Sequence, residues 1–186
     1  MTGPGRPRLR ILRTDELTTK EVVAIRRLMI DAFGTDPEEA FTDDDWAHAE
    51  GGRHFVLDLD GDVLTHAAVV ERELHLSGRP LRTGYVEAVA TAPAHDGRGH
   101  GSQVMEAVGD HIRDAYDLGA LGTGRHRFYE RLGWERWRGR AFVRGPDGPE
   151  RTPADEGYIL VLRTAATPAI DLDGDISCEW RPGDVW

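Results

Sequence analysis

A glycine-dense loop at residues 96–101 constrains the fold of this chain more than any other feature. The loop follows an apolar run, YVEAVAT, and leads directly into residues 102–118, where apolar side chains recur at helical spacing. Gly97, Gly99 and Gly101 have no Cβ and can adopt positive φ angles, so consecutive backbone N–H groups can surround an anion at the positive end of a helix. The order of strand, glycine loop and helix therefore predicts a phosphate-binding site, and a cofactor that contains a pyrophosphate is its natural ligand.

Three types of phosphate-binding loop compete for this segment. A Walker loop needs a lysine before its hydroxyl residue, and none precedes Ser102, which argues against a nucleotide triphosphatase. A dinucleotide-binding fingerprint needs Gly or Ala at the position of Ser102. Asp117 lies near the distance at which that motif has its ribose-binding acid, but the match as a whole is weak. DGRGHG matches both glycines of Q/R-x-x-G-x-G/A, the acetyl-CoA loop of the GCN5-related N-acetyltransferases (GNAT), with Asp96 in place of Gln or Arg. A flexible surface turn without a ligand is the remaining alternative.

Further segments carry a more specific pattern. They are AF and TDDDWAH near the start, GYVEAVAT before the loop, RFYERLGW and RTPADEG after it, and the terminal CEWRPGDVW. In this order, over nearly the whole chain, they resemble the aminoglycoside 2'-N-acetyltransferases of actinobacteria, a GNAT family. The resemblance implies an enzyme that transfers an acetyl group from acetyl-CoA directly to the 2'-amino group of an aminoglycoside antibiotic in a ternary complex, conferring resistance.

Length and charge limit the class of protein. The 186 residues fit one domain, 1–186, in which we expect the C-terminal segment 164–186 to complete the substrate site. The net charge of −10 argues against nucleic acid or an anionic membrane as partner and favours a cationic small molecule. The single cysteine, Cys178, excludes an internal disulfide and a cysteine zinc site. With no signal-peptide or membrane-spanning pattern, we expect a cytoplasmic protein; the resemblance implies a homodimer.

The hydrophobic pattern predicts a mixed α/β (α+β) fold. Strands are expected at residues 9–12, 53–59, 63–76, 81–91, within 119–124, at 134–143 and at 158–162, and helices at 16–33, 42–46, 102–118 and in a short segment ending at 132. A polar loop is expected at 145–157. The Asp-Gly pair at 60–61 predicts a hairpin, Thr42 is a candidate helix cap, and the helix at 16–33 has apolar residues at helical spacing on one face. Antiparallel hairpins followed by one strand–loop–helix crossover indicate a mixed central sheet with helices on both faces. The GNAT resemblance implies that two central parallel strands of this single domain splay apart.

Two side chains, together with the terminal carboxylate of Trp186 discussed below, are candidates for proton transfer. Glu87 lies on the strand beside the expected splay, where a carboxylate can remove the ammonium proton directly or through water. Its alternative role is to orient the substrate. Tyr129 resembles the family tyrosine near the cofactor sulfur, and its alternative role is packing in the core.

The cofactor is expected at the glycine loop, with no metal. The expected cofactor-binding residues are Val89, through its main chain as the resemblance implies, and Arg98, Gly99, His100, Gly101 and Ser102. Asp96 places a negative charge near the expected pyrophosphate, which Arg98 can offset. An EF-hand at 171–182 is rejected because glycine and an acid are missing from its sixth and twelfth positions.

The resemblance also implies the substrate residues, chiefly acids that face a polyamine sugar. They are Asp36, Asp45, Glu87, Thr123, Asp155, Asp184 and Trp186. An aromatic side chain as the last residue predicts a tail that packs on the domain, and its terminal carboxylate can share the base role with Glu87. The alternatives are a GNAT enzyme that acetylates another amino sugar or polyamine, and a catalytically silent protein that binds aminoglycosides.

Overall fold

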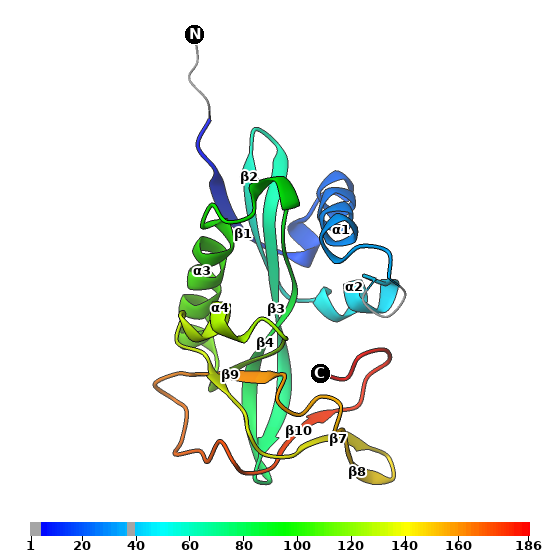
Figure 1. The fold of residues 1–186 in the computed structure, drawn as a ribbon, viewed down its shortest axis with the longest axis vertical. Helices are drawn as coiled ribbons and strands as arrows, with labels where there is room; N and C mark the ends of the chain where they lie inside the picture. The colour runs from blue at the N-terminus through cyan, green and yellow to red at the C-terminus, as the bar shows by residue number, and fades with distance from the viewer. Residues whose placement is uncertain (1–4, 37–39) are drawn as a thin grey trace. The chain divides into compact units, whose positions relative to one another are not determined.

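The computed structural model describes residues 5–36 and 40–186 (Figure 1). Its backbone contacts divide the chain into two compact units. The first unit comprises Met1–Val70 and Val86–Val108, and the second comprises Glu71–Tyr85 and Gly109–Trp186. Because the cuts fall inside secondary-structure elements, two strands and one helix have residues in both units.

The sheet of the first unit includes three consecutive antiparallel strands, besides the end of a fourth strand described below. They are β1 (Arg8–Arg13), β2 (Arg53–Leu59) and the first part of β3 (Asp62–Leu76). β2 pairs with both of the others. The turn between β2 and β3 has φ angles of 53° at Asp60 and 95° at Gly61, as a two-residue hairpin requires. The Asp-Gly hairpin expected from the sequence is therefore confirmed together with both flanking strands.

The first unit contains α1 (Thr19–Phe33) and α2 (Asp43–Ala49). Each begins with a capping box, in which Thr18 or Thr42 accepts a hydrogen bond from the third helical residue. α1 buries one apolar face, as its spacing predicts, whereas α2 continues past its expected end at residue 46 to Ala49. The resulting core is built from Ile25, Leu28, Met29, Trp46, Val56 and Ala90.

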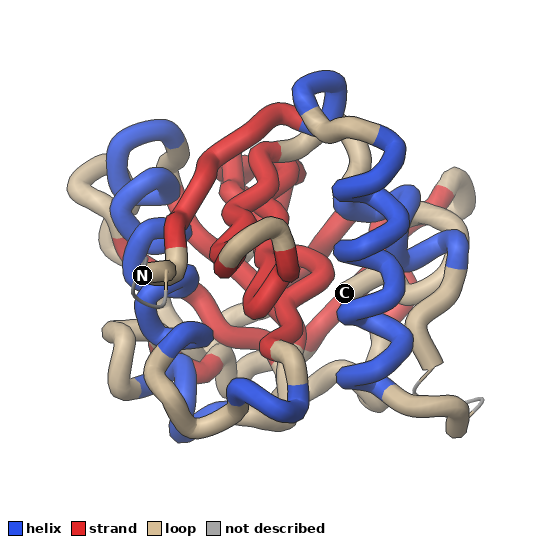
Figure 2. Tube along the Cα trace, turned by 90° about the horizontal axis from the view of Figure 1, so that it is seen from above, coloured by secondary structure: helices blue, strands red, loops and turns tan. Residues whose placement is uncertain are grey.

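Helix α3 (His100–Ala115) begins inside the glycine loop. In the first unit, α1 and the first turns of α3 lie on opposite sides of the strands, as Figure 2 shows from above. The expected arrangement of helices on both faces is confirmed there. The helix ends at Ala115, earlier than the expected 118, because Leu118 already belongs to the next strand.

The second unit contains most of the remaining strands. They are β5 (Leu118–Gly122), β6 (Glu135–Arg136), β7 (Ala141–Gly145), β8 (Gly148–Arg151), β9 (Ile159–Arg163) and β10 (Ile176–Glu179), with the short helix α4 (His126–Glu130) between β5 and β6. β9 pairs antiparallel with both β5 and β6, and β10 pairs parallel with β7. Four of the five residues of β9 are buried, which explains its unbroken apolar sequence.

The prediction of a single strand at 134–143 was wrong, because β6 and β7 are separate strands. The intervening backbone bonds to a distant loop: Arg138 and Gly139 both donate their N–H groups to the carbonyl oxygen of Leu172, at 2.8 and 3.0 Å. Trp137 is buried and donates its indole N–H to the Gly174 carbonyl. A Cβ on Gly139 would lie 1.8 Å from that same carbonyl oxygen, so only glycine allows this approach.

Two more strands, β8 and β10, were not predicted from the sequence. β8 lies in the expected polar loop and forms a hairpin with β7, where Gly148 has a φ of 109°. The Asp-Gly pair at 147–148 was the available signal. β10 lies in the terminal segment. Its four residues alternate between buried and half-buried in the structure, and this alternation is the only mark of a strand.

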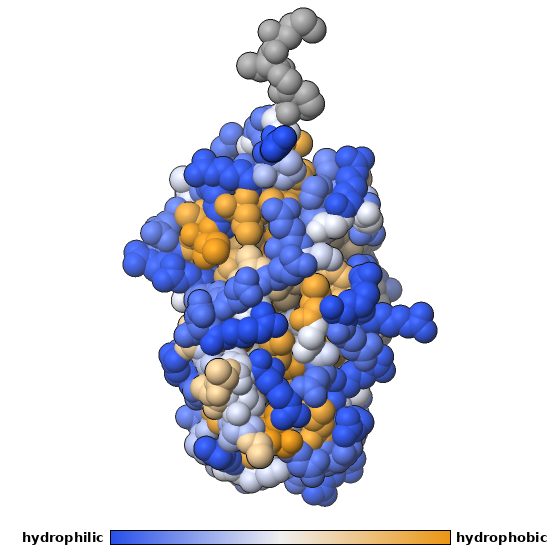
Figure 3. All heavy atoms as spheres, turned by 90° about the vertical axis from the view of Figure 1, so that its left-hand side faces the viewer, coloured by the Kyte–Doolittle hydropathy of each residue, from blue (hydrophilic) through white to orange (hydrophobic). Residues whose placement is uncertain are grey.

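The described residues include ten strands in one mixed sheet. Its parallel central pair joins β5 to β4 (Arg79–Thr91) at only three positions, ending at Tyr85, although β4 continues to Thr91. This short ladder agrees with the expected splay. No helix in the described part of the chain is long and apolar enough to cross a membrane. Hydrophilic side chains dominate the face in Figure 3, and hydrophobic ones reach it only in separate areas.

Candidate active site

The glycine loop has the backbone conformation that an anion site requires. Gly97 and Gly99 have φ angles of 72° and 83°, and nothing lies within 4 Å of a Cβ built on either residue. Glycine is therefore needed for the backbone conformation and not for lack of space. Gly101 differs from the expectation, because it lies in the first turn of α3 and has no positive φ.

The first turn of α3 supplies backbone donors. The hydrogen-bond ladder starts where Gln103 donates its N–H to the Gly99 carbonyl, at 3.0 Å. The N–H groups of His100, Gly101 and Ser102 come before this point, where a helix offers them no acceptor of its own. A loop of this shape at a helix N-terminus fits a pyrophosphate.

Asp96 is the residue that departs from the usual acetyl-CoA loop, and its carboxylate turns back onto the loop. It accepts the N–H of Gly97 at 2.9 Å. The side chain thus stabilises the turn but uses one backbone donor and brings a negative charge to the anion site. Arg98 is exposed in the same loop. The negative charge of Asp96 and the positive charge of Arg98 therefore have opposite effects on an anion bound at this loop.

Glu87 and Val89 lie on either side of an irregularity in β4. Ala88 between them has a φ of 50°, in the left-handed region. All three residues are half-buried, in a strand whose neighbours Val86 and Ala90 are buried. A left-handed residue inside a strand is typical of a β-bulge, and we call this irregularity the bulge at Ala88. A bulge turns the side chains beside it away from the regular alternation of a strand.

Tyr129 lies in α4 of the second unit and is 5% exposed. Its ring packs edge-on against Phe128 and Trp134, at centroid distances of 4.9 and 6.1 Å. Burial raises the pKa of its hydroxyl to about 12. Since a thiol has a pKa of about 8.5, full proton transfer from Tyr129 to a thiolate would be uphill by about 5 kcal/mol. The neutral hydroxyl is therefore suited to donate a hydrogen bond.

The end of the chain is anchored in the second unit, as its terminal tryptophan predicted. The Trp186 indole N–H donates to Oγ1 of Thr152 at 3.1 Å. The Val185 carbonyl accepts from Sγ of Cys178, and the Asp184 carbonyl accepts from Nε of Arg181. The terminal carbonyl carbon lies 3.5 Å from a Cβ built on Gly122, so the end of β5 faces the terminal carboxylate.

Two of the expected substrate acids are brought together beside this tail. Burial raises the pKa of the Asp155 carboxyl, a hydrogen bond from Thr152 opposes the rise, and the charge of Asp184 adds to it. The hydroxyl of Thr152 thereby links Asp155 to the indole of Trp186. Asp155 and Asp184 form an acidic pair beside the indole of Trp186, and we call this pair the tail cluster.

The other expected substrate residues have local contacts. Asp45 accepts the N–H and the hydroxyl of Thr42, both at 2.7 Å, and so caps α2. Oγ1 of Thr123 accepts the N–H of Arg125 at 3.0 Å, which closes the turn before α4. Asp36 is exposed, and the acidic residues 38 and 39 after it lie outside the described residues. A role for these three side chains in substrate binding stays a prediction.

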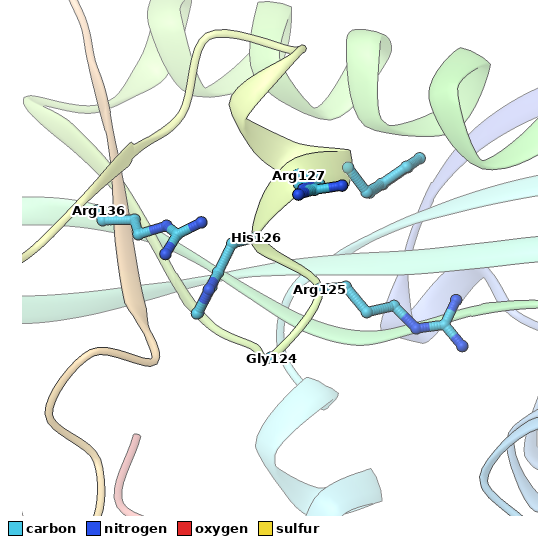
Figure 4. Close-up of a pocket in the computed structure, with 6 residues that line it drawn as sticks. Gly124, Arg125, His126, Arg127 and Arg136 are labelled. Carbon is cyan, nitrogen blue, oxygen red and sulfur yellow. The ribbon is translucent and has the colours of Figure 1, made fainter.

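A basic hollow of about 470 Å³ at the start of α4 was missed in the sequence (Figure 4). It is lined by Gly124, Arg125, His126, Arg127, Phe128 and Arg136. The guanidinium of Arg136 bonds to Glu130 at 2.6 Å, so one of these cations is already paired. The available signal was the run GRHR, which concentrates three basic side chains after a glycine. Within residues 5–36 and 40–186, no group of three His, Cys, Asp or Glu side chains could hold a metal ion.

Comparison with known proteins gives consistent matches. The acetyltransferase (GNAT) domain profile matches residues 13–137. An aminoglycoside 2'-N-acetyltransferase of Mycolicibacterium fortuitum is 41% identical over 182 residues, which cover 95% of this chain and 91% of that protein.

Solved structures match the fold. The GNAT family N-acetyltransferase YhbS of Escherichia coli, crystallised with CoA, has a TM-score of 0.69 at 19% identity and covers 96% of this chain and 92% of its own. A GCN5-related N-acetyltransferase of Kribbella flavida has a TM-score of 0.57 at 22% identity; the match covers 72% of this chain but only 34% of that longer one. The chain belongs to the GNAT family of acetyltransferases.

Proposed function

We propose that this protein is an acetyl-CoA-dependent aminoglycoside 2'-N-acetyltransferase. The tail cluster is the observation that carries the substrate assignment, because it brings two carboxylates together next to an aromatic ring. A polyamine sugar presents several ammonium groups that such a cluster can bind by charge-assisted hydrogen bonds. The 41% identical aminoglycoside 2'-N-acetyltransferase supports the same substrate class.

The glycine loop is the proposed cofactor site. The backbone N–H groups of His100, Gly101 and Ser102 would hold the pyrophosphate of acetyl-CoA, and the main chain of Val89 its pantetheine amides. Bound acetyl-CoA supplies an activated thioester. Arg98 adds a positive charge that offsets Asp96 in the same loop. The positive end of the α3 dipole favours the phosphates further.

Glu87 and Tyr129 are assigned to proton handling. The carboxylate of Glu87 removes a proton from the 2'-ammonium group, directly or through water, so that the amine becomes nucleophilic. The hydroxyl of Tyr129 keeps its proton, since its pKa is raised to about 12, and donates a hydrogen bond to the leaving sulfur. The resulting loss of one ammonium charge weakens binding of the drug to ribosomal RNA.

The proposal extends to the substrate residues and to the setting of the enzyme. Asp36, Asp45 and Thr123 are assigned to the drug with the tail cluster, by the resemblance described above. The terminal carboxylate of Trp186 is assigned a share of the base role. The net charge of −10 favours the cationic drug over nucleic acid and anionic membranes as partner. We place the enzyme in the cytoplasm, where acetyl-CoA is available, and expect a homodimer.

Release of CoA thiol from acetyl-CoA tests this proposal when two matched acceptors are compared. Kanamycin B has an amino group at the 2' position, and kanamycin A has a hydroxyl group there. We expect turnover with kanamycin B and loss of nearly all turnover with kanamycin A. Equal rates would contradict a 2'-amino specificity, faster turnover of spermidine would favour another polyamine substrate, and tight binding without thiol release would favour a silent binding protein.

A further inference from the structure

Ala88 has an unusual backbone conformation for its position. Among the described residues, three other than glycine have positive φ angles: Asp60, Ser77 and Ala88. Asp60 and Ser77 lie in hairpin turns, where this conformation is common. Ala88 lies inside β4, and alanine gains nothing locally from a left-handed backbone. Contacts from the surrounding structure must therefore hold it.

A chain of buried hydrogen bonds ends at the carbonyl of this residue. Nδ1 of His66 lies 2.7 Å from the Ala88 oxygen, and Nε2 of His66 lies 2.9 Å from Nδ1 of His54. Nε2 of His54 lies 2.8 Å from Oγ1 of Thr14, which accepts the N–H of Gly51 at 3.0 Å. The chain thus crosses β2 and β3 before it reaches β4.

The chemistry of the last contact fixes the direction of every bond in the chain. A carbonyl oxygen only accepts, so Nδ1 of His66 carries a proton and donates it to Ala88. In a neutral ring Nε2 of His66 must then accept, so His54 donates from Nδ1. Nε2 of His54 accepts in turn from the hydroxyl of Thr14. Both rings therefore have the same tautomer, with the proton on Nδ1.

The two rings are rigidly held. Each histidine is 0% exposed, and the ring of Trp46 packs 5.7 Å from that of His54. Burial lowers the pKa of His54 to about 4 and, with a further contribution from His54, that of His66 to about 3. The rings are neutral at neutral pH, as the directed chain requires. Neither ring takes part in the proton handling assigned to Glu87.

We propose that His66, oriented by His54, is a positioning residue that fixes the bulge at Ala88 and thereby aims the carboxylate of Glu87 and the main chain of Val89. The roles of Glu87 and Val89 rest on the proposed function; the anchoring of the bulge does not. His66 contacts neither the drug nor the cofactor in this account. It acts through the peptide groups on both sides of Ala88.

Two substitutions of nearly equal shape separate the hydrogen bond from packing. His66→Leu and His66→Asn both replace the ring by a short branched side chain and both remove the acceptor for His54. Asn places an amide N–H close to the former Nδ1, whereas Leu has no donor there. Thr65→Val is the matched control, because it removes another side-chain hydrogen bond between β3 and β4, at 3.1 Å to Thr91, and leaves the contact of His66 with the Ala88 carbonyl in place.

The first measurement observes the bulge in the protein without any ligand. Labelling alanine carbonyls with ¹³C and valine amides with ¹⁵N selects the three Ala-Val peptide groups of the chain, at 68–69, 88–89 and 107–108. We expect His66→Leu to shift the 88–89 signal and to speed its amide exchange, while His66→Asn keeps it near the wild-type position. An 88–89 signal that is the same in wild type and His66→Leu would overturn the anchoring.

The second measurement tests the consequence for the reaction. With His66→Leu still folded, we expect kcat to fall about tenfold or more, because small displacements of a catalytic group cost up to about 10²-fold. His66→Asn should recover most of this loss, and Thr65→Val should keep the wild-type kcat. If His66→Leu shifts the 88–89 signal but keeps the wild-type kcat and KM, the aiming of Glu87 is overturned. If the wild type itself acetylates no aminoglycoside, the proposed function fails, and the shifted 88–89 signal still supports the anchoring.

Discussion

The buried pair His54 and His66 predicts a specific loss of stability on mild acidification. In the unfolded chain both rings bind protons below a pKa of 6.5, whereas burial holds their pKa values in the folded state at about 4 and about 3. A depressed histidine pKa means that the unfolded state binds more protons, so stability is complete above pH 6.5 and falls as the pH is lowered toward 4. At pH 5 the unfolded state gains about 2 kcal/mol from each ring, or about 4 kcal/mol for the pair.

Urea unfolding at pH 7.5, 6.5, 5.5 and 5.0 measures this loss. The comparison protein is the double variant His54→Gln/His66→Leu, which keeps every carboxylate but lacks both rings. Its unfolding free energy should change between pH 7.5 and 5.0 by about 4 kcal/mol less than that of the wild type. Carboxylate effects cancel in the difference, including that of Glu21, whose hydrogen bonds with Thr18 and Arg10 hold its pKa at about 2. Parallel pH curves for the two proteins would refute the assignment of neutral, buried rings.

Further expectations concern the catalytic groups, the loop and the tail. Glu87→Gln keeps the shape of the side chain but removes the base, so kcat with kanamycin B should fall about 10²-fold; a change confined to KM would leave Glu87 only a substrate contact. Tyr129→Phe should lower kcat at unchanged KM in steady-state assays, and full turnover would reduce the tyrosine to packing. Asp96→Asn keeps the acceptor for Gly97 but removes its charge, so calorimetry should find tighter binding of acetyl-CoA, and weaker binding would contradict the charge argument. Two glycines added after Trp186 move the carboxylate away and should raise the KM for the drug about tenfold while the acetyl-CoA KM holds; identical kinetics would exclude the tail from the site.

Local sequence signals predicted the parts of the fold that depend on short-range chemistry. The Asp-Gly turn, the threonine cap of α2 and the apolar face of α1 all have their cause within a few residues. The break between β6 and β7 has its cause in the loop at residues 172–174, which no pattern near Trp137 reveals. β10 was missed for a similar reason, since its neighbours in the sheet are far away in the sequence.

The candidate site likewise has features that local sequence signals predict and one feature that they do not. The glycine loop and the anchored Trp186 could be recognised because glycines before a helix and a terminal aromatic residue are local signals. The bulge at Ala88 could not, because alanine gives no sign of a left-handed backbone and its partner His66 lies 22 residues earlier. The conformation of this residue is decided by a buried side chain on another strand.

The position of the transferred acetyl group tests the central claim most directly. Kanamycin B incubated with the protein and acetyl-CoA can be purified, and two-dimensional NMR assigns the acetylated nitrogen. We expect one product, with the acetyl group on the 2'-nitrogen. Acetylation at another amino group, or a mixture of positions, would contradict it.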